Sequence, residues 1–370
     1  MSRSSPRVLH FTPFEGLAGA NRSCLTLVEE QARRRPTFVM SLFEGEFSTA
    51  AAATGAEARP VFPAADGETP LWQRLPKWQR MIHAVRAIRR AIDDWRIDLV
   101  HCHSPRGVRY TYPAVLGKRT PLLTHQRDNY ERNYFHLGLG RSDHLVAISE
   151  WVKQTLPGRM QRKSTVVYNA VQLPSDELVT SCLEERSITI GMPGRCEPEK
   201  GLDILLNALP SLNLDTPFSV RAVGVSAPDR DDYSRQVHAI VAGYNDELRK
   251  RVHLEPFRAD IENFYASVDV VVMPSRFHEP FGRVAIEAMA WRRPVVVSNR
   301  GGLPEIVDHG RTGLIFDADD VSDLAQKLND LLADGLLRER LAHEGREEVK
   351  RRFLPGPHAD AIDAIYEKML

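Results

Sequence analysis

The sequence predicts an α/β protein made of two doubly wound parallel sheets. Its 370 residues exceed what one typical hydrophobic core holds, which favours two domains. Short runs rich in β-branched residues, such as residues 268–273, are typical of strands buried inside a parallel sheet. Loops and segments with apolar residues at helical spacing follow these runs, so strand, loop and helix alternate along the chain.

Composition places the chain among ordinary globular proteins. Hydrophobic residues make up 42% and charged residues 26%, and the 49 basic residues balance the 49 acidic ones. The net charge therefore gives no indication of a nucleic-acid partner. The four cysteines have no paired spacing, which favours a reducing cytoplasm. Residues 1–7 contain no apolar signal region. The sequence also lacks a run of about 18 apolar residues, the length expected for a helix that spans a membrane.

The first half begins with an apolar strand at residues 8–11 and a loop at residues 12–20 that contains Gly16 and Gly19. Asn21 is a suitable N-cap for the helix expected next. Strand, glycine loop and helix form the general phosphate-cradling arrangement, although many loops with two glycines bind no phosphate. Further strands are expected at residues 37–43, 61–62, 97–103, 121–128 and 143–148.

Residues 71–95 have apolar residues at helical spacing, so one face of a helix should pack on a core. The other face is basic and lies near Trp72 and Trp78. Two interpretations stay open, namely contact with an anionic membrane surface and the solvated face of a packed helix. The cations concerned are Arg74, Lys77, Arg80, Arg86, Arg89 and Arg90.

Histidines mark two strand ends in the first half. His101 and His103 alternate onto one face of their strand, where we expect a structural or cleft-lining role, because a metal site would need further ligands. His125 stands at the polar tip of the strand at residues 121–128. Ligands of open α/β sheets bind beyond the carboxyl ends of strands, so His125 is a candidate site residue.

The second half restarts with a strand at residues 187–193 and a glycine-flanked loop that carries Arg195 and Lys200. An arginine binds phosphate oxygens through two N–H groups and a lysine adds a point charge. Two such cations before a helix therefore suit a diphosphate, whereas the alternative is a pair of ordinary surface cations.

A strand, a loop and a helix start follow one another across residues 268–291. We expect Pro280 in the first helical turn, where its missing N–H is tolerated, and an anion at the N–H groups near Gly282. Glu279 and Glu287 frame this anion site. Because a helix rises about 1.5 Å per residue, Glu287 should lie roughly 9 Å from the helix start, close to the span between the distal phosphate and the ribose of a nucleotide.

Glu279, Pro280-Phe281-Gly282 and Glu287 resemble the Glu-x7-Glu signature of the retaining family-4 glycosyltransferases, which have the GT-B fold. Gly194-Arg195…Lys200-Gly201 is similar to the Gly-Arg…Lys-Gly motif of that family, and Thr124-His125 to its Thr-His strand end. Arg283 departs from the family pattern, which usually has an apolar residue after the glycine.

The resemblance implies two Rossmann-like domains facing across a cleft. Residues 1–178, with a terminal helix at 356–370 crossing back, would bind the acceptor, and residues 179–355 would bind the nucleotide-sugar donor. The implied catalytic residues are Glu279, His125, Arg195 and Lys200. The implied substrate-binding residues are Gly19, Arg195, Lys200, Phe257, Glu279, Phe281, Gly282 and Glu287.

Within this pattern, Arg195 and Lys200 bind the diphosphate, Glu279 the sugar hydroxyls and Glu287 the ribose. His125 would contact the transferred sugar, and the loop of Phe257 would approach the base. Asp128, Arg132 and Tyr134 follow the His125 strand on the acceptor side. Asp317-Ala318-Asp319 is interpreted as helix capping and not as a metal-binding motif.

The resemblance implies retaining glycosyl transfer without a metal or cofactor. A hexose or N-acetylhexosamine would pass from a UDP- or GDP-sugar to a glycan, glycolipid or other hydroxyl acceptor. The expected setting is bacterial surface polysaccharide biosynthesis in the cytoplasm, with peripheral contact at the inner face of the cell membrane. Alternatives are a soluble small-molecule acceptor, a GT-B epimerase or phosphorylase, and a non-catalytic nucleotide-sugar-binding subunit.

Overall fold

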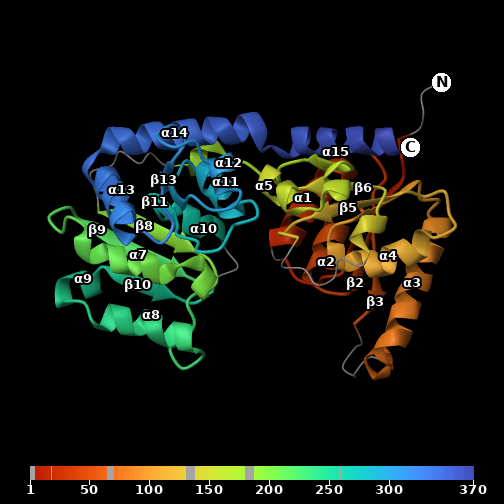
Figure 1. The fold of residues 1–370 in the computed structure, drawn as a ribbon, viewed down its shortest axis with the longest axis horizontal. Helices are drawn as coiled ribbons and strands as arrows, with labels where there is room; N and C mark the ends of the chain where they lie inside the picture. The colour runs from red at the N-terminus through yellow and green to blue at the C-terminus, as the bar shows by residue number, and fades with distance from the viewer. Residues whose placement is uncertain (1–4, 18, 65–70, 131–137, 180–186, 258–260) are drawn as a thin grey trace. The chain divides into compact units, whose positions relative to one another are not determined.

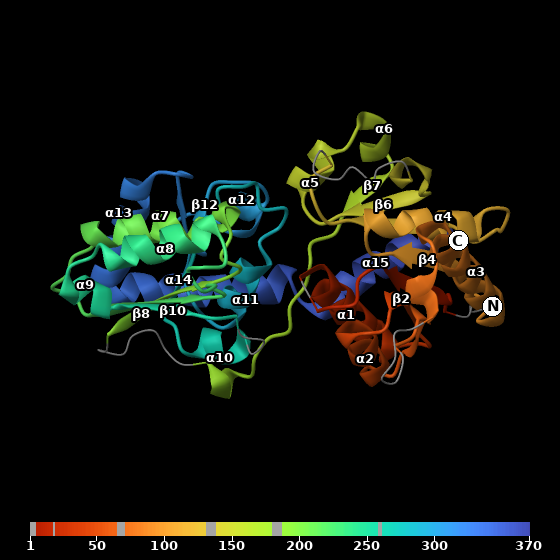
Figure 2. The ribbon, with the colours of Figure 1, turned by 90° about the horizontal axis from the view of Figure 1, so that it is seen from below.

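The computed structural model describes residues 5–17, 19–64, 71–130, 138–179, 187–257 and 261–370. Its contacts divide the chain into two compact units (Figures 1 and 2). Unit 1 comprises Met1–Ala170 and Pro355–Leu370, and unit 2 comprises Val171–Leu354. The unit changes after residue 170, before the expected boundary at residue 178. The Val171 N–H donates to the carbonyl of Phe353, which belongs to the same unit, at 2.9 Å.

Unit 1 contains a seven-stranded parallel sheet in the order β3-β2-β1-β4-β5-β6-β7. The order reverses between β1 and β4, which creates a switch point at the carboxyl ends of these strands. Leu9, Phe11 and Val100 are fully buried in the core beneath it. The strands are β1 Val8–Thr12, β2 Phe38–Phe43, β3 Glu57–Phe62, β4 Leu99–Cys102, β5 Leu122–Gln126, β6 His144–Ala147 and β7 Ser164–Val166.

Helices cover the sheet of unit 1, including the terminal helix α15. Gln31 of α1 donates to Asp363 of α15 at 2.6 Å, and Leu27 shares a buried cluster with Ile362 and Tyr366. The helices are α1 Gly19–Ala32, α2 Glu46–Ala53, α3 Lys77–Asp94, α4 Val108–Val115, α5 Glu150–Thr155, α6 Gly158–Gln161 and α15 Pro355–Met369, with 3-10 turns η1 Leu71–Arg74, η2 Pro105–Gly107 and η3 Leu139–Arg141.

Unit 2 contains a six-stranded parallel sheet in the order β10-β9-β8-β11-β12-β13. Its switch point lies between β8 and β11. The strands are β8 Ile188–Pro193, β9 Phe218–Val223, β10 Val252–Glu255, β11 Val270–Met273, β12 Val295–Ser298 and β13 Leu314–Phe316. The four residues of β11 and of β12 are all buried, as their apolar sequences predict.

The helices of unit 2 pack around this sheet. Buried leucines of α7 and α13, including Leu205 and Leu328, form one core cluster with Val272 and Val296 of the sheet. The helices are α7 Leu202–Ala208, α8 Asp232–Ala242, α9 Asp246–Lys250, α10 Ile261–Ala266, α11 Arg283–Ala290, α12 Leu303–Ile306, α13 Val321–Ala333 and α14 Gly335–Arg352, with 3-10 turns η4 Asp176–Leu178, η5 Pro198–Lys200 and η6 Leu209–Ser211.

Two local predictions were wrong. Asn21 does not cap α1, which begins at Gly19; its side-chain amide instead donates to the Gly16 carbonyl at 2.6 Å and holds the glycine loop. Pro280 does not lie in the first turn of α11, because Gly282 is the N-cap and the helix begins at Arg283. Gly282 has a left-handed backbone conformation, which separates the loop of Pro280 from α11.

Within the part of the chain that the structure describes, no helix combines the length and the apolar content needed to cross a bilayer.

Candidate functional site

The switch point of unit 2 brings together two of the residues singled out from the sequence. Lys200 ends the loop after β8, and Glu279 lies in the loop after β11. The Lys200 ammonium contacts Glu279 Oε2 at 3.0 Å and lies over the Phe277 ring, 4.6 Å from its centroid. The side chains of Lys200 and Glu279 are 23% and 14% exposed, so a half-buried ion pair stands at the position where α/β sheets bind ligands.

Backbone contacts hold the two loops against each other. The Arg276 N–H donates to the Glu199 carbonyl at 2.9 Å. Gly201, directly after Lys200, has a φ of 72°, and a Cβ at this position would clash with the Pro274 carbonyl oxygen. Glycine is therefore needed both for the left-handed conformation and for the close approach of the loops.

A second ion pair strengthens this junction. The Arg276 guanidinium donates to both carboxylate oxygens of Asp203 at 2.6 Å, and the Tyr233 hydroxyl donates to Asp203 at 2.6 Å. Burial acts to raise the pKa of Asp203, but the hydrogen bonds from Arg276 and Tyr233 leave it below its ordinary value. These three residues were not identified from the sequence, since their pairing joins positions 30 and 73 residues apart.

Glu287 is fixed by two neighbours in the first turns of α11 and in α10. The Arg283 Nε donates to Glu287 Oε1 at 2.6 Å, and the Tyr265 hydroxyl donates to Glu287 Oε2 at 2.9 Å. Arg283, the departure from the family pattern, therefore orients the carboxylate expected to bind the ribose. The spacing of four residues on one helix is a signal that could have identified this pair.

The glycine that precedes α11 is required by its surroundings. Gly282 has a φ of 105°, and a Cβ there would lie 2.6 Å from Leu303 Cδ2. The Phe281 side chain is buried and packs edge-on against Phe353, with ring centroids 6.1 Å apart. Only the backbone of Phe281 is therefore suited to face a ligand. The Glu279 carbonyl accepts from the Gly302 N–H at 2.7 Å, which braces the same loop.

The structure leaves the other expected donor residues exposed. Arg195 is 71% exposed and pairs with Glu197 at 2.6 Å. Phe257 is 74% exposed beyond β10. Both side chains are accessible to a ligand. Neither forms an ion pair or a hydrogen bond with Lys200 or Glu279 among the contacts of the described residues.

In unit 1, His125 belongs to a buried array of histidines. Its Nδ1 lies 2.8 Å from His101 Nε2, and His101 Nδ1 lies 2.6 Å from the Tyr366 hydroxyl. His10 Nδ1 lies 2.9 Å from His103 Nε2. The Nε2 atoms of His125 and His10 are buried without a hydrogen-bond partner among the described residues. Burial, followed by the charge of Arg127, holds the pKa of His125 well below its ordinary value, so its ring is neutral at pH 7.

The nitrogens of His10, His101 and His103 lie within 4.8 Å of one another, which is a spacing that allows a metal ion. The rings of His101 and His103 are stacked, with centroids 4.0 Å apart and planes at 29°. Both ring nitrogens of His101 and of His103 have hydrogen-bond partners. The structural or cleft-lining role expected for these two residues stays a prediction.

The remaining expectations concern loops. Gly19 is the first residue of α1, and a Cβ there would meet no atom within 4 Å. Arg132 and Tyr134 lie outside the described residues. The capping assigned to Asp317 and Asp319 was wrong, because Asp320 caps α13 by accepting from the N–H groups of Ser322 and Asp323.

Asp317 and Asp319 have other partners in this turn. Asp317 accepts from Asn299 at 2.8 Å, and Asp319 pairs with Arg300 at 2.9 Å. These contacts tie the turn after β13 to the turn after β12, which gives both aspartates a structural role.

Two Rossmann-like units, each built on a parallel sheet, give the chain the architecture of the GT-B fold. Residues 17–173 match the model of Glycosyltransferase Family 4, and residues 180–348 match that of glycosyl transferases group 1. The chain belongs to the family-4 glycosyltransferases.

Relatives share sequence with the chain, and a solved structure shares its fold. The chain is 29% identical over 305 residues to spore coat protein SA of Bacillus subtilis, covering 74% of this chain and 79% of the relative. It is 26% identical over 240 residues to the capsular polysaccharide biosynthesis glycosyltransferase CapM of Staphylococcus aureus, covering 61% and 62% of the two chains. The structure of HepE from Anabaena in complex with UDP superposes with a TM-score of 0.81 at 22% identity, covering 98% of this chain and 100% of HepE.

Proposed function

We propose that this glycosyltransferase retains anomeric configuration and moves a hexose or N-acetylhexosamine from a UDP- or GDP-sugar to a glycan or glycolipid hydroxyl. The observation that carries the proposal is the Lys200–Glu279 ion pair at the switch point of unit 2. Glu287, held by Arg283 and Tyr265, lies eight residues further along the chain, as the Glu-x7-Glu signature requires. The complex of HepE with UDP supports a uridine nucleotide as the first donor to test.

The donor diphosphate would meet Lys200, Arg195 and the N-terminal N–H groups of α11. During transfer the bond between the anomeric carbon and the phosphate oxygen breaks, and negative charge grows on the diphosphate. Positive groups that are already in position before the reaction stabilise that charge more in the transition state than in the ground state. The acceptor oxygen bonds to the anomeric carbon on the same face, and its proton passes to the leaving phosphate oxygen.

The two carboxylates would bind hydroxyl groups in this scheme. Glu279 accepts hydrogen bonds from the sugar, and Glu287 accepts them from the ribose. Glu279 is therefore a positioning group for the sugar and not a nucleophile. The cations and the helix start balance the donor charge, so the proposal includes no metal and no cofactor.

The acceptor side of the proposal rests on unit 1. The similarity to CapM, a glycosyltransferase of capsular polysaccharide biosynthesis, supports a surface glycan or its lipid-linked precursor as acceptor. Trp78, Met81 and Ile82 of α3 are 59%, 44% and 39% exposed beside basic residues. We therefore place the enzyme at the cytoplasmic face of the membrane, where each cation near anionic lipid adds about 1 kcal/mol.

The basic face of α3 is smaller than the sequence suggested. Arg89 Nη1 donates to the carbonyls of Ala114 and Leu116 at 3.1 and 2.8 Å, so this guanidinium holds the end of α4. A liposome co-sedimentation test should therefore change Arg80, Arg86 and Arg90 to Gln and leave Arg89 intact. Equal sedimentation of this variant and the native protein with anionic vesicles would contradict membrane contact through α3.

The donor and the stereochemistry are tested together. Purified protein is incubated with UDP-glucose, UDP-N-acetylglucosamine or GDP-mannose in the presence of EDTA, and the released sugar or product is followed by proton NMR. Release of a sugar that keeps the donor's anomeric configuration supports a retaining, metal-independent enzyme. Binding without turnover of any donor would favour a non-catalytic nucleotide-sugar-binding subunit. Restoration of activity by Mg²⁺ or Mn²⁺ alone would contradict metal independence.

A further inference from the structure

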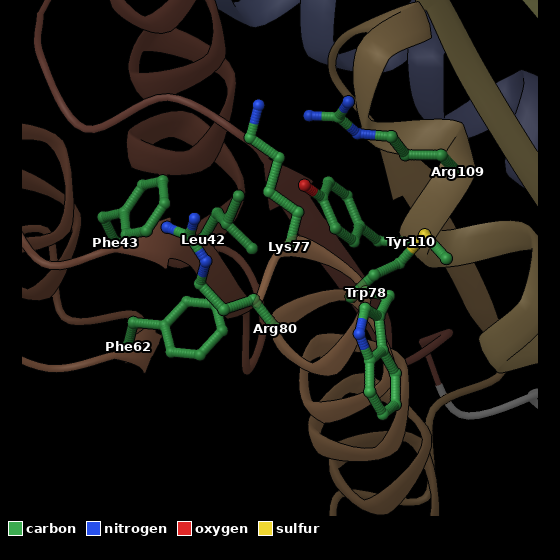
Figure 3. Close-up of a pocket in the computed structure, with 9 residues that line it drawn as sticks. Leu42, Phe43, Phe62, Lys77, Trp78, Arg80, Arg109 and Tyr110 are labelled. Atoms are coloured by element: carbon green, nitrogen blue, oxygen red, sulfur yellow. The ribbon is translucent and has the colours of Figure 1, made fainter. Parts of the chain in front are cut away.

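Unit 1 contains a pocket of about 510 Å³ between the ends of two strands and two helices (Figure 3). This volume is within the range of small-ligand sites. The strands contribute their carboxyl ends, where ligands of α/β sheets bind. The residues that line the pocket are Leu42 and Phe43 of β2, Phe62 of β3, Lys77, Trp78, Arg80 and Met81 of α3, and Arg109 and Tyr110 of α4.

The floor of the pocket is an aromatic cluster with fixed geometry. The rings of Phe43 and Phe62 are stacked with centroids 5.7 Å apart, and each lies 5.1 Å from the Trp72 ring. The Trp72 indole N–H donates to the Pro63 carbonyl at 3.0 Å, which anchors this ring. The floor therefore offers a preformed apolar surface to a ligand.

The rim of the pocket is cationic. Figure 3 shows the charged ends of Lys77 and Arg109 directed to the same side, near the Tyr110 hydroxyl, whereas Arg80 lies beside Phe43. Among the described residues, none of those that line the pocket is acidic. Among the ion pairs of the described residues, none involves Lys77 or Arg80, so their charge is available to an anion.

The apolar and cationic surface continues past the pocket along α3. A second hollow of about 430 Å³ lies on the other side of Trp78, lined by Leu75, Ile82 and His83 together with Arg86 and Arg90. Trp78 lines both hollows and is 59% exposed. A compact soluble anion would need only the first hollow, whereas a ligand with an apolar chain would use the continuous surface.

We propose that the pocket of unit 1 binds the phosphate of an amphiphilic acceptor, with the attached apolar chain lying over the aromatic floor and Trp78. This inference rests on the proposed function in one respect, because only that function identifies the ligand of unit 1 as the acceptor. Three cations around one space suit a phosphate group better than a single carboxylate, because a phosphate carries up to two charges and three oxygens. Apolar contact with Phe43, Trp78 and Met81, which are less buried than Leu42 and Phe62, adds the affinity that the cations alone do not supply.

The test uses geranyl monophosphate, which joins one phosphate to a short prenyl chain, kept below its aggregation concentration. Calorimetry compares it with geraniol and with inorganic phosphate on the full-length protein. We expect geranyl monophosphate to bind and the two half-ligands to bind at least about tenfold more weakly, since each has only part of the contacts. Equal affinity for inorganic phosphate, or no binding of geranyl monophosphate, would overturn the proposal.

Variants assign the binding to this pocket. Lys77→Gln with Arg80→Gln, and separately Arg109→Gln, should weaken geranyl monophosphate at least about tenfold, as expected for lost charge-assisted contacts. The matched control, Arg33→Gln with Arg119→Gln, removes two exposed cations elsewhere in unit 1 and should leave affinity unchanged. Equal losses in the control and the pocket variants would mean bulk charge attraction and would contradict a defined site.

Two further measurements separate this proposal from its alternatives. UDP affinity should be the same in native and pocket variants, because UDP is assigned to unit 2. If the native protein binds no nucleotide but still binds geranyl monophosphate through Lys77 and Arg80, the proposed function fails and the pocket stands. If anionic vesicles bind but geranyl monophosphate does not compete with them, the surface recognises a bilayer and the proposal of a phosphate pocket is wrong.

Discussion

Arg283 and Glu287 form a hydrogen-bonded ion pair one turn apart on α11, with Nε and Oε1 separated by 2.6 Å. Their side chains are only 20% and 16% exposed, so solvent screens the pair less than it would on an open surface. Tyr265 donates to the second carboxylate oxygen, at 2.9 Å. The Glu287 carboxylate is therefore oriented before a ligand arrives, which reduces the entropy lost on binding.

The first prediction follows from this orientation. Replacing Arg283 by Leu, the kind of residue the family usually has there, should weaken UDP or GDP binding about three- to tenfold, because Glu287 loses one of two positioning contacts. Tyr265→Phe should have a similar effect, and the double variant a larger one. Calorimetry with the nucleoside diphosphate measures this. Tighter binding by Arg283→Leu would instead mean that Arg283 competes with the ribose for Glu287.

The second prediction separates the two glutamates. Glu287→Ala should weaken the nucleoside diphosphate itself, because its partner is the ribose. Glu279→Ala should leave nucleoside diphosphate affinity within about threefold of native and depress turnover, because its partner is the sugar. Binding by calorimetry and turnover by NMR on the same preparations give the two values. A reversed pattern would show that the donor lies in the opposite direction along α11.

The third prediction concerns the cations. Lys200→Ala should weaken the nucleoside diphosphate by about 1.5–3 kcal/mol, the range for a charge-assisted contact. It also leaves Glu279 without its cation, so the double variant Lys200→Ala with Glu279→Gln should recover part of the loss in folding stability. Arg195→Ala should weaken the same ligand less, because this side chain is 71% exposed. Unchanged nucleoside diphosphate affinity in both single variants would remove these residues from the diphosphate site.

The sequence was sufficient for the features that depend on local pattern. Apolar runs identified the buried strands β11 and β12, and glycine spacing identified the loops of Lys200 and Gly282. Contacts between distant residues were out of reach, such as Arg276 with Asp203 and Tyr265 with Glu287. The role of Asn21 was also missed, because a residue suited to an N-cap can equally hydrogen-bond a preceding loop from inside the helix.

The last prediction concerns the buried histidines of unit 1. Burial first, then the charge of Arg35, lowers the pKa of His10 to about 3. Burial likewise lowers the pKa of His358 to about 4, although its hydrogen bond to the Tyr168 carbonyl acts in the opposite direction. His101, His103 and His125 are lowered well below 6.5, with burial as the main cause. All five rings are therefore neutral in the folded protein near pH 7.

The sign of the pH dependence follows from these directions. Between pH 6.5 and the folded-state pKa, the unfolded chain binds more protons than the folded one, so the free energy of unfolding falls as the pH falls. Each histidine contributes a loss of about 1.4 kcal/mol per pH unit in this window, which for His358 ends near pH 4. Unit 1 should therefore lose stability steeply below pH 6.5 and show little dependence on these groups above it.

Urea unfolding at pH 8, 6.5 and 5 tests this, with tryptophan fluorescence as the probe, since Trp72, Trp78, Trp95 and Trp151 lie in unit 1 and only Trp291 lies in unit 2. His358→Gln keeps a side-chain N–H that can donate to the Tyr168 carbonyl. Below pH 6.5 this variant should show a shallower dependence of the free energy of unfolding on pH, by the equivalent of about one proton. His253→Gln changes an exposed histidine of unit 2 and should leave the slope as it is in the native protein. A native slope that is flat between pH 6.5 and 5 would mean that the histidine array is already charged or hydrated in the folded state.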